Sequence, residues 1–146
     1  MLNLYLDNCC FNRPFDDQTQ TKIKIETLAK LSIQRQIINE RYRLVWSYIL
    51  QYENMVNPYS FRRENINKWE DIAQIYIGGD DKVDLLIQYY ENRGIRLKDA
   101  AHLACAEYAM ADYFITTDSG ILKKANLSRG QFKIVSPVDF ITAKGD

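Results

Sequence analysis

The segment LNLYLD, residues 2–7, opens the chain with an apolar strand pattern that ends in an acidic side chain. Residues 2–6 are apolar enough to be covered on both faces, which is typical of a strand inside a parallel sheet. A second run of this kind, YFITTD at 113–118, also ends in a carboxylate. Because neighbouring parallel strands end at one edge of a sheet, we expect Asp7 and Asp118 to converge there.

Strand and helix patterns alternate along the rest of the chain. Strands are expected at 42–46, 113–117 and 132–135, and helices at 19–38, 47–57, 60–76, 81–92, 97–110 and 119–126, with a loop at 12–17 and a closing turn. A short strand at 74–77 is an alternative to the end of helix 60–76. Ile23, Leu28, Leu31 and Ile38 predict an amphipathic helix over 19–38. The alternation indicates an α/β fold with a mostly parallel sheet.

Length and composition indicate an ordinary globular protein. The 146 residues predict one domain, 1–146, with 47% hydrophobic and 26% charged residues. No apolar run reaches membrane-spanning length and no signal peptide is visible, so a cytoplasmic protein without membrane association is expected. The three cysteines lack zinc-site spacing and are expected to be buried reduced thiols.

The charge balance excludes one simple kind of nucleic-acid binder. Nineteen basic and nineteen acidic residues give a formal net charge of zero, so the chain is not broadly cationic. A neutral total is still compatible with acids clustered at a metal site and bases around it.

Four carboxylates, Asp7, Glu53, Asp99 and Asp118, lie near expected strand–helix junctions. Clustered acidic oxygens bind hard divalent cations such as Mg²⁺ or Mn²⁺. Such ions activate water and stabilise the charge that develops during phosphodiester cleavage. The set therefore predicts a metal-dependent nuclease.

Each of the four acids also has a structural interpretation. Asp7 and Asp118 could cap the helices that follow them, and Asp99 could complement the dipole of helix 97–110. Glu53 follows Ser47, whose hydroxyl is placed to cap a helix, and a glutamate on such a helix is often solvated. The alanines around Asp99 suggest close packing, which would place its carboxylate near the sheet.

Taken in order, the segments LYLDN at 4–8, Ser47 to Glu53, LKDAAHLA at 97–104 and ITTD at 115–118 resemble the PIN domain family. The resemblance covers essentially the whole chain. It implies a three-layer fold with a central, mostly parallel sheet flanked by helices.

The resemblance also implies a function. PIN domains are metal-dependent nucleases, many of them ribonucleases, and they include VapC-type toxins of toxin–antitoxin pairs. This chain would then be an endoribonuclease that uses Mg²⁺ or Mn²⁺ on an RNA substrate, with an antitoxin protein as partner and a homodimer as its assembly. Asp7, Glu53, Asp99 and Asp118 match the acidic metal-site positions, Glu53 least securely.

Three further residues are candidates for supporting roles. Asn8 stands where the family often has Thr or Ser, so a hydroxyl role is absent there, although the amide could orient water or phosphate. Thr117 and Ser119 flank Asp118 and could support it through hydrogen bonds.

Other residues could contact RNA or protons. Arg13, Arg62 and Lys123 follow the predicted acids and could hold phosphates, or they could be ordinary solvated charges. Some of the ten tyrosines could stack on unpaired bases, although core or interface roles are commoner. His102, the only histidine, could be a base or metal ligand, but the alanine-rich helix favours a packed structural residue.

Two alternatives come from other classes of protein. A PIN-like module without catalysis could bind RNA or a protein, although all four acids are present. Receiver domains and haloacid-type phosphatases also place an Asp after the first strand. Their further acids are missing, because Leu6 and Asn8 flank Asp7 and position 9 is Cys9.

Overall fold

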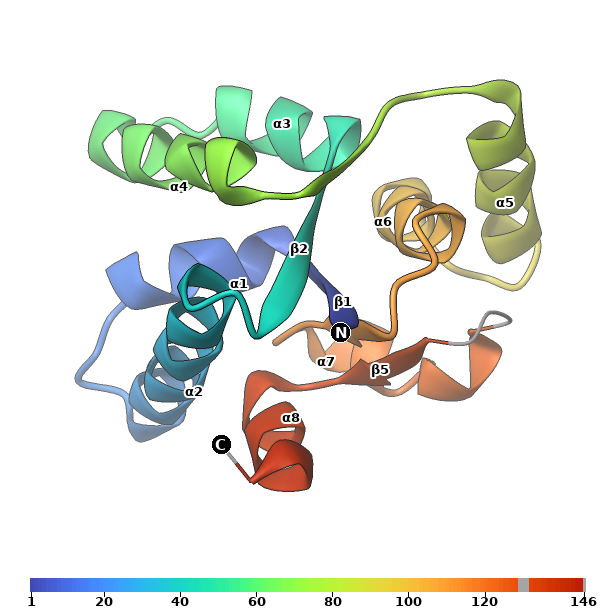
Figure 1. Ribbon diagram of the computed structural model, residues 1–146. Coiled ribbons are helices and arrows are strands. Elements are labelled where there is room, and N and C mark those ends of the chain that lie inside the picture. The colour runs from blue at the N-terminus through green and yellow to red at the C-terminus, as the bar shows by residue number, and fades with distance from the viewer. Residues whose placement is uncertain (129–131, 146) are drawn as a thin grey trace.

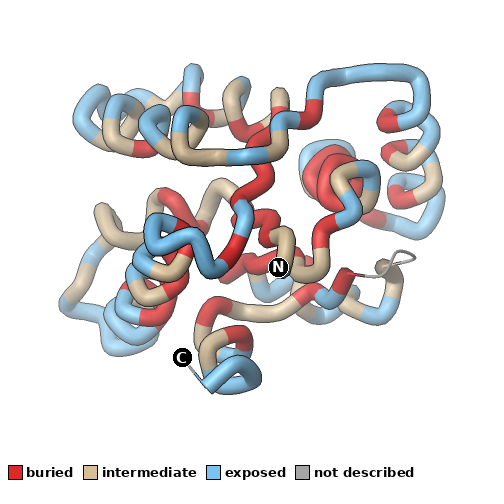
Figure 2. Tube along the Cα trace, in the orientation of Figure 1, coloured by how far each residue is buried: buried red, intermediate tan, exposed pale blue. Residues whose placement is uncertain are grey.

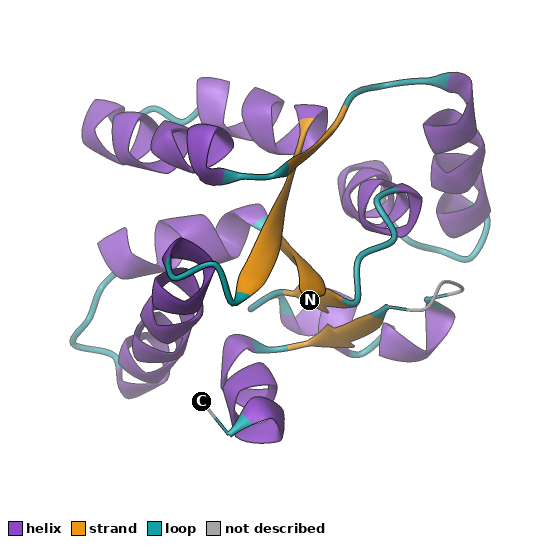
Figure 3. Ribbon diagram, viewed as in Figure 1, coloured by secondary structure: helices purple, strands orange, loops and turns teal. Residues whose placement is uncertain are grey.

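A twisted parallel sheet forms the centre of the protein (Figures 1 and 3). The computed structural model describes residues 1–128 and 132–145. Over these residues the sheet has five strands in the order β3-β2-β1-β4-β5, and every neighbouring pair is parallel. The strands are β1 (Leu2–Leu6), β2 (Tyr42–Ser47), β3 (Ile75–Ile77), β4 (Tyr113–Ile115) and β5 (Lys133–Val135).

Helices cover both faces of this sheet (Figure 1). On one face lie α5 (Asp81–Glu91) and α6 (Leu97–Tyr108); on the other lie α2 (Thr21–Ile38) and α8 (Pro137–Lys144). The remaining helical segments of the described chain are α1 (Asn8–Asn12), η1 (Arg13–Phe15), α3 (Tyr48–Met55), α4 (Ser60–Ile72), α7 (Ser119–Leu122) and η2 (Ala125–Leu127). The predicted α/β fold, with three layers and a parallel sheet, is therefore confirmed.

The central strand, β1, is buried from both sides. Leu4, Tyr5 and Leu6 have no exposed surface, as expected for a strand that has neighbours on both edges and helices on both faces (Figure 2). Side chains alternate between the two faces. Tyr5 stacks on Phe114 with ring centroids 5.3 Å apart and contacts α6, whereas Phe140 of α8 packs from the opposite face.

The register of β1 and β4 brings their carboxyl ends together. Leu6 is opposite Ile115, and the backbone N–H of Asp7 donates to the carbonyl of Ile115 at 2.9 Å. The residues that follow both strands therefore leave the sheet at the same edge. This register puts Asp7 beside the turn that carries Asp118.

The expectation for helix 19–38 was correct in extent and wrong in its buried face. Leu28, Leu31 and Ile38 are exposed, whereas Lys30 and Ile33 are among the buried residues. The stripe that packs inward contains Ala29, Ile33 and Ile37, four residues apart, together with several polar side chains. The chain contains two apolar stripes on this helix, and contacts with η1 and α8 decide which one is buried.

Three local expectations need correction. The predicted helix 60–76 ends at Ile72, and 75–77 forms strand β3, the alternative interpretation. The predicted closing turn is the helix α8, which Ser136 caps by accepting from the N–H of Asp139. The expected loop at 12–17 contains the end of α1 and the short helix η1. Within the described residues, no helix combines the length and apolar character needed to cross a membrane.

Candidate functional site

Asp7 lies in the junction between β1 and α1. Its Oδ1 accepts from the N–H of Asn8 at 2.8 Å, so it does cap the short helix α1. Its Oδ2 accepts from the hydroxyl of Thr116 at 2.8 Å, and the Cys9 thiol lies 3.6 Å away. These bonds hold an almost fully buried carboxylate at the carboxyl edge of the sheet.

Glu53 reaches the same place from α3. The helix begins directly after β2, where the Ser47 hydroxyl caps it by accepting from the N–H of Leu50 at 3.2 Å. The Glu53 side chain is 12% exposed, so it is not a solvated surface glutamate. Its Oε2 lies 3.7 Å from Nζ of Lys98, and its Oε1 pairs with Nε2 of His102.

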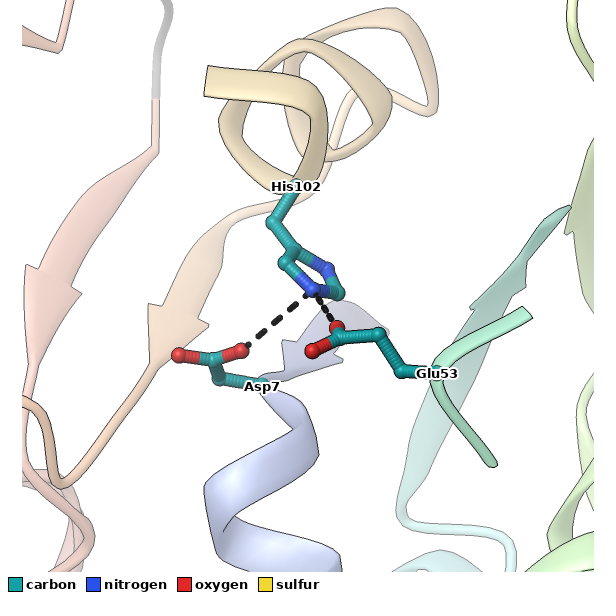
Figure 4. Close-up of side chains that lie close together, drawn as sticks. All are labelled: Asp7, Glu53 and His102. Atoms are coloured by element: carbon teal, nitrogen blue, oxygen red, sulfur yellow. Dashed lines mark hydrogen bonds and ion pairs between the residues drawn. The ribbon is translucent and has the colours of Figure 1, made fainter. Parts of the chain in front are cut away.

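His102 completes this group from α6 (Figure 4). Its Nε2 also lies 3.7 Å from Oδ1 of Asp7, so one nitrogen faces two carboxylates. Asp7, Glu53 and His102 each offer a ligand atom, and these atoms lie within 4.8 Å of one another. The three residues, here called the Asp7 cluster, come from three different elements that meet only in the folded chain.

The other ring nitrogen of His102 is bonded to the interior. Nδ1 lies 2.6 Å from the hydroxyl of Tyr5, which shares a 2.7 Å hydrogen bond with the hydroxyl of Ser47. Burial by itself lowers the pKa of His102, but the carboxylates of Asp7 and Glu53 outweigh it and raise this pKa above its usual value. The ring is thus oriented from inside and stabilised in its charged form from the cluster side.

Asp99 lies one turn before His102 on α6. Its side chain is 20% exposed, and Oδ2 is 3.7 Å from the guanidinium of Arg96. Burial raises the pKa of Asp99, and the negative charges of Asp7 and Asp118 raise it further. Mutual repulsion of this kind marks Asp99 as a neighbour of both acids, although it lies outside the close group of three.

Asp118 caps α7 at the end of the turn after β4. Its Oδ1 accepts from the N–H groups of Gly120 at 2.7 Å and Ile121 at 3.2 Å. A Cβ at position 120 would lie only 3.0 Å from this oxygen, so the glycine permits the close approach. The capping interpretation is correct for Asp118, and it accounts for one of the two carboxylate oxygens.

Comparison with known proteins gives a fold. No protein-family model and no curated protein matches the chain. Among solved structures, it is similar to a chain in the crystal structure of VapBC2 from Rickettsia felis bound to a DNA fragment from their promoter. That match has a TM-score of 0.55 and 12% identity over 92% of this chain and 98% of the other.

The fold is PIN-like. At 12% identity the similarity concerns the arrangement of strands and helices and not the residues of any site. The roles of side chains in this protein therefore rest on their own geometry.

Asn8, Thr117 and Ser119 were predicted to support the four acids of the expected metal site. The Asn8 side chain accepts from Asn12 Nδ2 at 3.3 Å, and the Thr117 hydroxyl accepts from Arg13 at 2.8 Å. Ser119 is exposed in the first turn of α7. Thr116, which the sequence did not single out, also bonds directly to the Asp7 carboxylate. Its hydroxyl donates to Asp7 and accepts from the N–H of Asp118 at 3.0 Å, linking two acids.

The predicted phosphate-binding residues differ in whether they are paired with acids or exposed. Arg13 is held by ion pairs with Asp16 at 3.1 Å and Glu26 at 3.5 Å, and Arg62 pairs with the same Asp16 at 3.1 Å. Lys123 is exposed in the turn after α7. Lys98, which the sequence gave no reason to choose, is the cation that lies against Glu53.

Proposed function

We propose that this protein is a divalent-metal-dependent endoribonuclease formed by a single PIN-like domain. The observation that carries the proposal is the convergence of Asp7, Glu53 and His102 at the carboxyl edge of the sheet. Asp99 is close enough for the Asp7 charge to raise its pKa. The charged ring of His102 offsets part of the repulsion among these carboxylates, but the charges of Asp7 and Asp118 still raise the pKa of Asp99, so a divalent cation would stabilise the group further.

The donor set fits such an ion. Asp7, Glu53, Asp99 and Asp118 would supply hard oxygens, which Mg²⁺ and Mn²⁺ prefer. The ring of His102 would favour Mn²⁺ of the two, once the metal displaces the proton on Nε2. When bound, the metal would supply an activated water and neutralise charge on the phosphoryl oxygens. The polar support is also present, since Thr116 fixes Asp7 and Tyr5 orients the ring of His102.

The basic residues have separate tasks in this proposal. Lys98 lies beside Glu53 and is 66% exposed, so its ammonium is available to a phosphate that approaches the cluster. Lys123 would contact the RNA backbone beyond Asp118. Arg13 and Arg62 are already paired with acids, so their contribution is to order the loop around the site and to touch RNA only at its margin.

We also propose a biological setting. The structural similarity to a chain of a VapBC2 complex supports a role as the toxin of a toxin–antitoxin pair, in the cytoplasm, with an antitoxin protein as partner and a homodimer as the assembled form. Expression of the chain alone should then arrest growth, and the arrest should depend on Asp7.

The test is cleavage of a labelled single-stranded RNA by the wild type and by Asp99→Asn, in Mn²⁺ or in EDTA. Asp81→Asn is the matched control, because Asp81 occupies the first turn of α5 as Asp99 occupies the first turn of α6, and it is exposed. We expect metal-dependent cleavage that falls by more than about 100-fold in Asp99→Asn, beyond the usual cost of losing an outer-sphere partner. Asp81→Asn should cleave as the wild type does.

Two results would contradict the proposal. Full activity of folded Asp99→Asn would remove this residue from the site. Absence of cleavage together with absence of any Mn²⁺ effect on the melting temperature would favour a PIN-like module that binds RNA or protein without catalysis, since a bound ligand stabilises the folded state.

A further inference from the structure

A hollow of about 280 Å³ lies next to the Asp7 cluster. Residues of α1, the second half of α3, the loop that follows it and the start of α6 line it, and Glu53 belongs to both the hollow and the cluster. A group held in this hollow therefore lies within one side chain of the candidate metal ligands.

Two exposed tyrosines form part of the wall of the hollow. Tyr52 and Tyr59 line it, and they are 62% and 61% exposed. Large aromatic rings left in water lose the stabilisation that burial would give them, so two of them beside a charged site mark a surface that can gain energy by stacking.

Tyr59 is held in place by Arg62, which also lines the hollow. The guanidinium of Arg62 lies 4.9 Å from the centre of the Tyr59 ring. Arg62 is itself fixed by a hydrogen bond to the carbonyl of Phe15 at 2.6 Å and by its ion pair with Asp16. A ring supported in this way loses little freedom when a planar group packs on it, which makes it a ready stacking platform.

A row of amides forms another wall. Asn57 donates to Asn12 at 3.2 Å, and Asn12 donates to the side chain of Asn8 at 3.3 Å. All three line the hollow, and Asn8 is the neighbour of Asp7 in sequence. Amides carry both donors and acceptors, which is what the edge of a nucleobase presents.

We propose that this hollow binds an unpaired nucleobase of the RNA substrate, with Tyr52 and Tyr59 as stacking residues. The phosphate attached to that nucleotide would lie toward Lys98 and the acids of the cluster. The inference rests on the proposed function for its choice of RNA, but binding of the base requires neither metal nor cleavage.

Charge favours an unpaired base over a duplex. The chain has a net charge of zero, and Arg13 and Arg62 near the site are already neutralised by acids. A duplex is bound chiefly through its dense phosphates, which bind weakly to a surface without net positive charge. Stacking on an aromatic ring does not require net charge. Binding should accordingly depend little on salt, with a log–log slope of magnitude below about 2, the value for two to three neutralised phosphates of a single strand.

The experiment measures fluorescence anisotropy of a labelled single-stranded RNA hexamer in EDTA, where no cleavage occurs. The variants Tyr52→Leu and Tyr59→Leu remove a stacking ring, and the Phe variants of the same residues retain it. Tyr76→Leu, on β3, removes a tyrosine that is 54% exposed and does not line the hollow. We expect each Leu variant at the hollow to weaken binding about 5- to 100-fold, from the usual strength of stacking on one base. The Phe variants and Tyr76→Leu should remain within about twofold of the wild type, since stacking is retained.

The outcomes separate this inference from the proposed nuclease. Equal affinity for the hexamer and its duplex, or wild-type affinity in both Leu variants, would overturn the base pocket while leaving metal-dependent cleavage to stand. Loss of binding in the Leu variants of a protein that cleaves nothing would support the pocket and overturn the nuclease.

Discussion

Two helices on opposite faces of the sheet each bury a basic side chain, and the surroundings of the two side chains differ. His102 on α6 is 1% exposed and faces the carboxylates of Asp7 and Glu53. Lys30 on α2 is 2% exposed and lies over the rings of Phe11 and Trp69, with Nζ 5.2 Å and 5.5 Å from their centres. Over the described part of the chain, Lys30 makes no hydrogen bond or ion pair.

The pKa values of the two groups move in opposite directions. Acids around His102 outweigh its burial and raise its pKa, whereas burial lowers the pKa of Lys30 to about 7, although the Cys10 thiol acts in the opposite direction. Aromatic rings attract an ammonium more weakly than carboxylates do. The lesson is that the α6 side of the sheet is organised to hold positive charge, as a metal site must be, and the α2 side is not.

The largest expected effect in this comparison is a difference between the wild type and Lys30→Met in how the free energy of unfolding depends on pH. The folded protein releases the Lys30 proton near pH 7, and the unfolded chain holds it to about 10.5. Between these values the unfolded state binds more protons, so wild-type stability rises with pH relative to the variant, by at most about 5 kcal/mol. Attraction to the two rings offsets about 1–2 kcal/mol of this.

Urea unfolding of both proteins from pH 6 to pH 10 measures that difference. The Met variant should be the more stable below pH 7, and its advantage should shrink as the pH rises. Lys68→Met is the matched control, because Lys68 on α4 is exposed and lines, with Lys30 of α2, a second hollow separate from the one beside the Asp7 cluster. A difference in unfolding free energy between the wild type and Lys30→Met that stays constant over this range would mean that burial does not lower the pKa of Lys30.

His102→Leu tests the other half of the comparison. Removing the ring leaves two acids without their cationic partner, and breaking a buried ion pair costs about 3–5 kcal/mol, less here because Glu53 is 12% exposed. We expect a loss of about 2–4 kcal/mol in EDTA that shrinks in saturating Mn²⁺, since the metal supplies positive charge to the same acids. The same loss in EDTA and in Mn²⁺, measured by chemical denaturation, would show that His102 acts only through packing.

A smaller effect is expected for Thr116→Val, which keeps the shape of the side chain and removes its hydroxyl. Two hydrogen bonds to the acids disappear, at a cost of about 1–2 kcal/mol in stability. The affinity for Mn²⁺ should fall about tenfold, because Thr116 positions Asp7. Thr19→Val, an exposed threonine that bonds to Asp17, provides the comparison. Unchanged Mn²⁺ affinity in Thr116→Val would show that Thr116 does not position Asp7 for metal binding.

The sequence predicted the edge of the sheet well because its signals are local. A buried strand followed at once by an acid places that acid at the end of the strand, so Asp7 and Asp118 could be placed before their surroundings were known. Their helix-capping roles were also predictable, since an Asp at a strand–helix junction caps by its own geometry.

Features that depend on contacts between distant segments were not predictable in this way. The histidine pairing with Glu53 joins α6 to α3, 49 residues apart, and the sequence favoured a merely packed His102. The buried face of α2 depends on which of two apolar stripes meets η1 and α8, so the burial of Lys30 was missed. Thr116 bonds to Asp7 only because β1 and β4 are neighbours.

The most direct test of the central claim, that the acids at this edge form a metal site, is calorimetric titration of Mn²⁺ into the wild type, Asp7→Asn and the control Asp81→Asn at pH 7. We predict saturable binding by the wild type and by Asp81→Asn, weakened by more than about 100-fold in Asp7→Asn, which exceeds the usual cost of losing an outer-sphere partner. Equal Mn²⁺ binding by the wild type and Asp7→Asn would contradict the account.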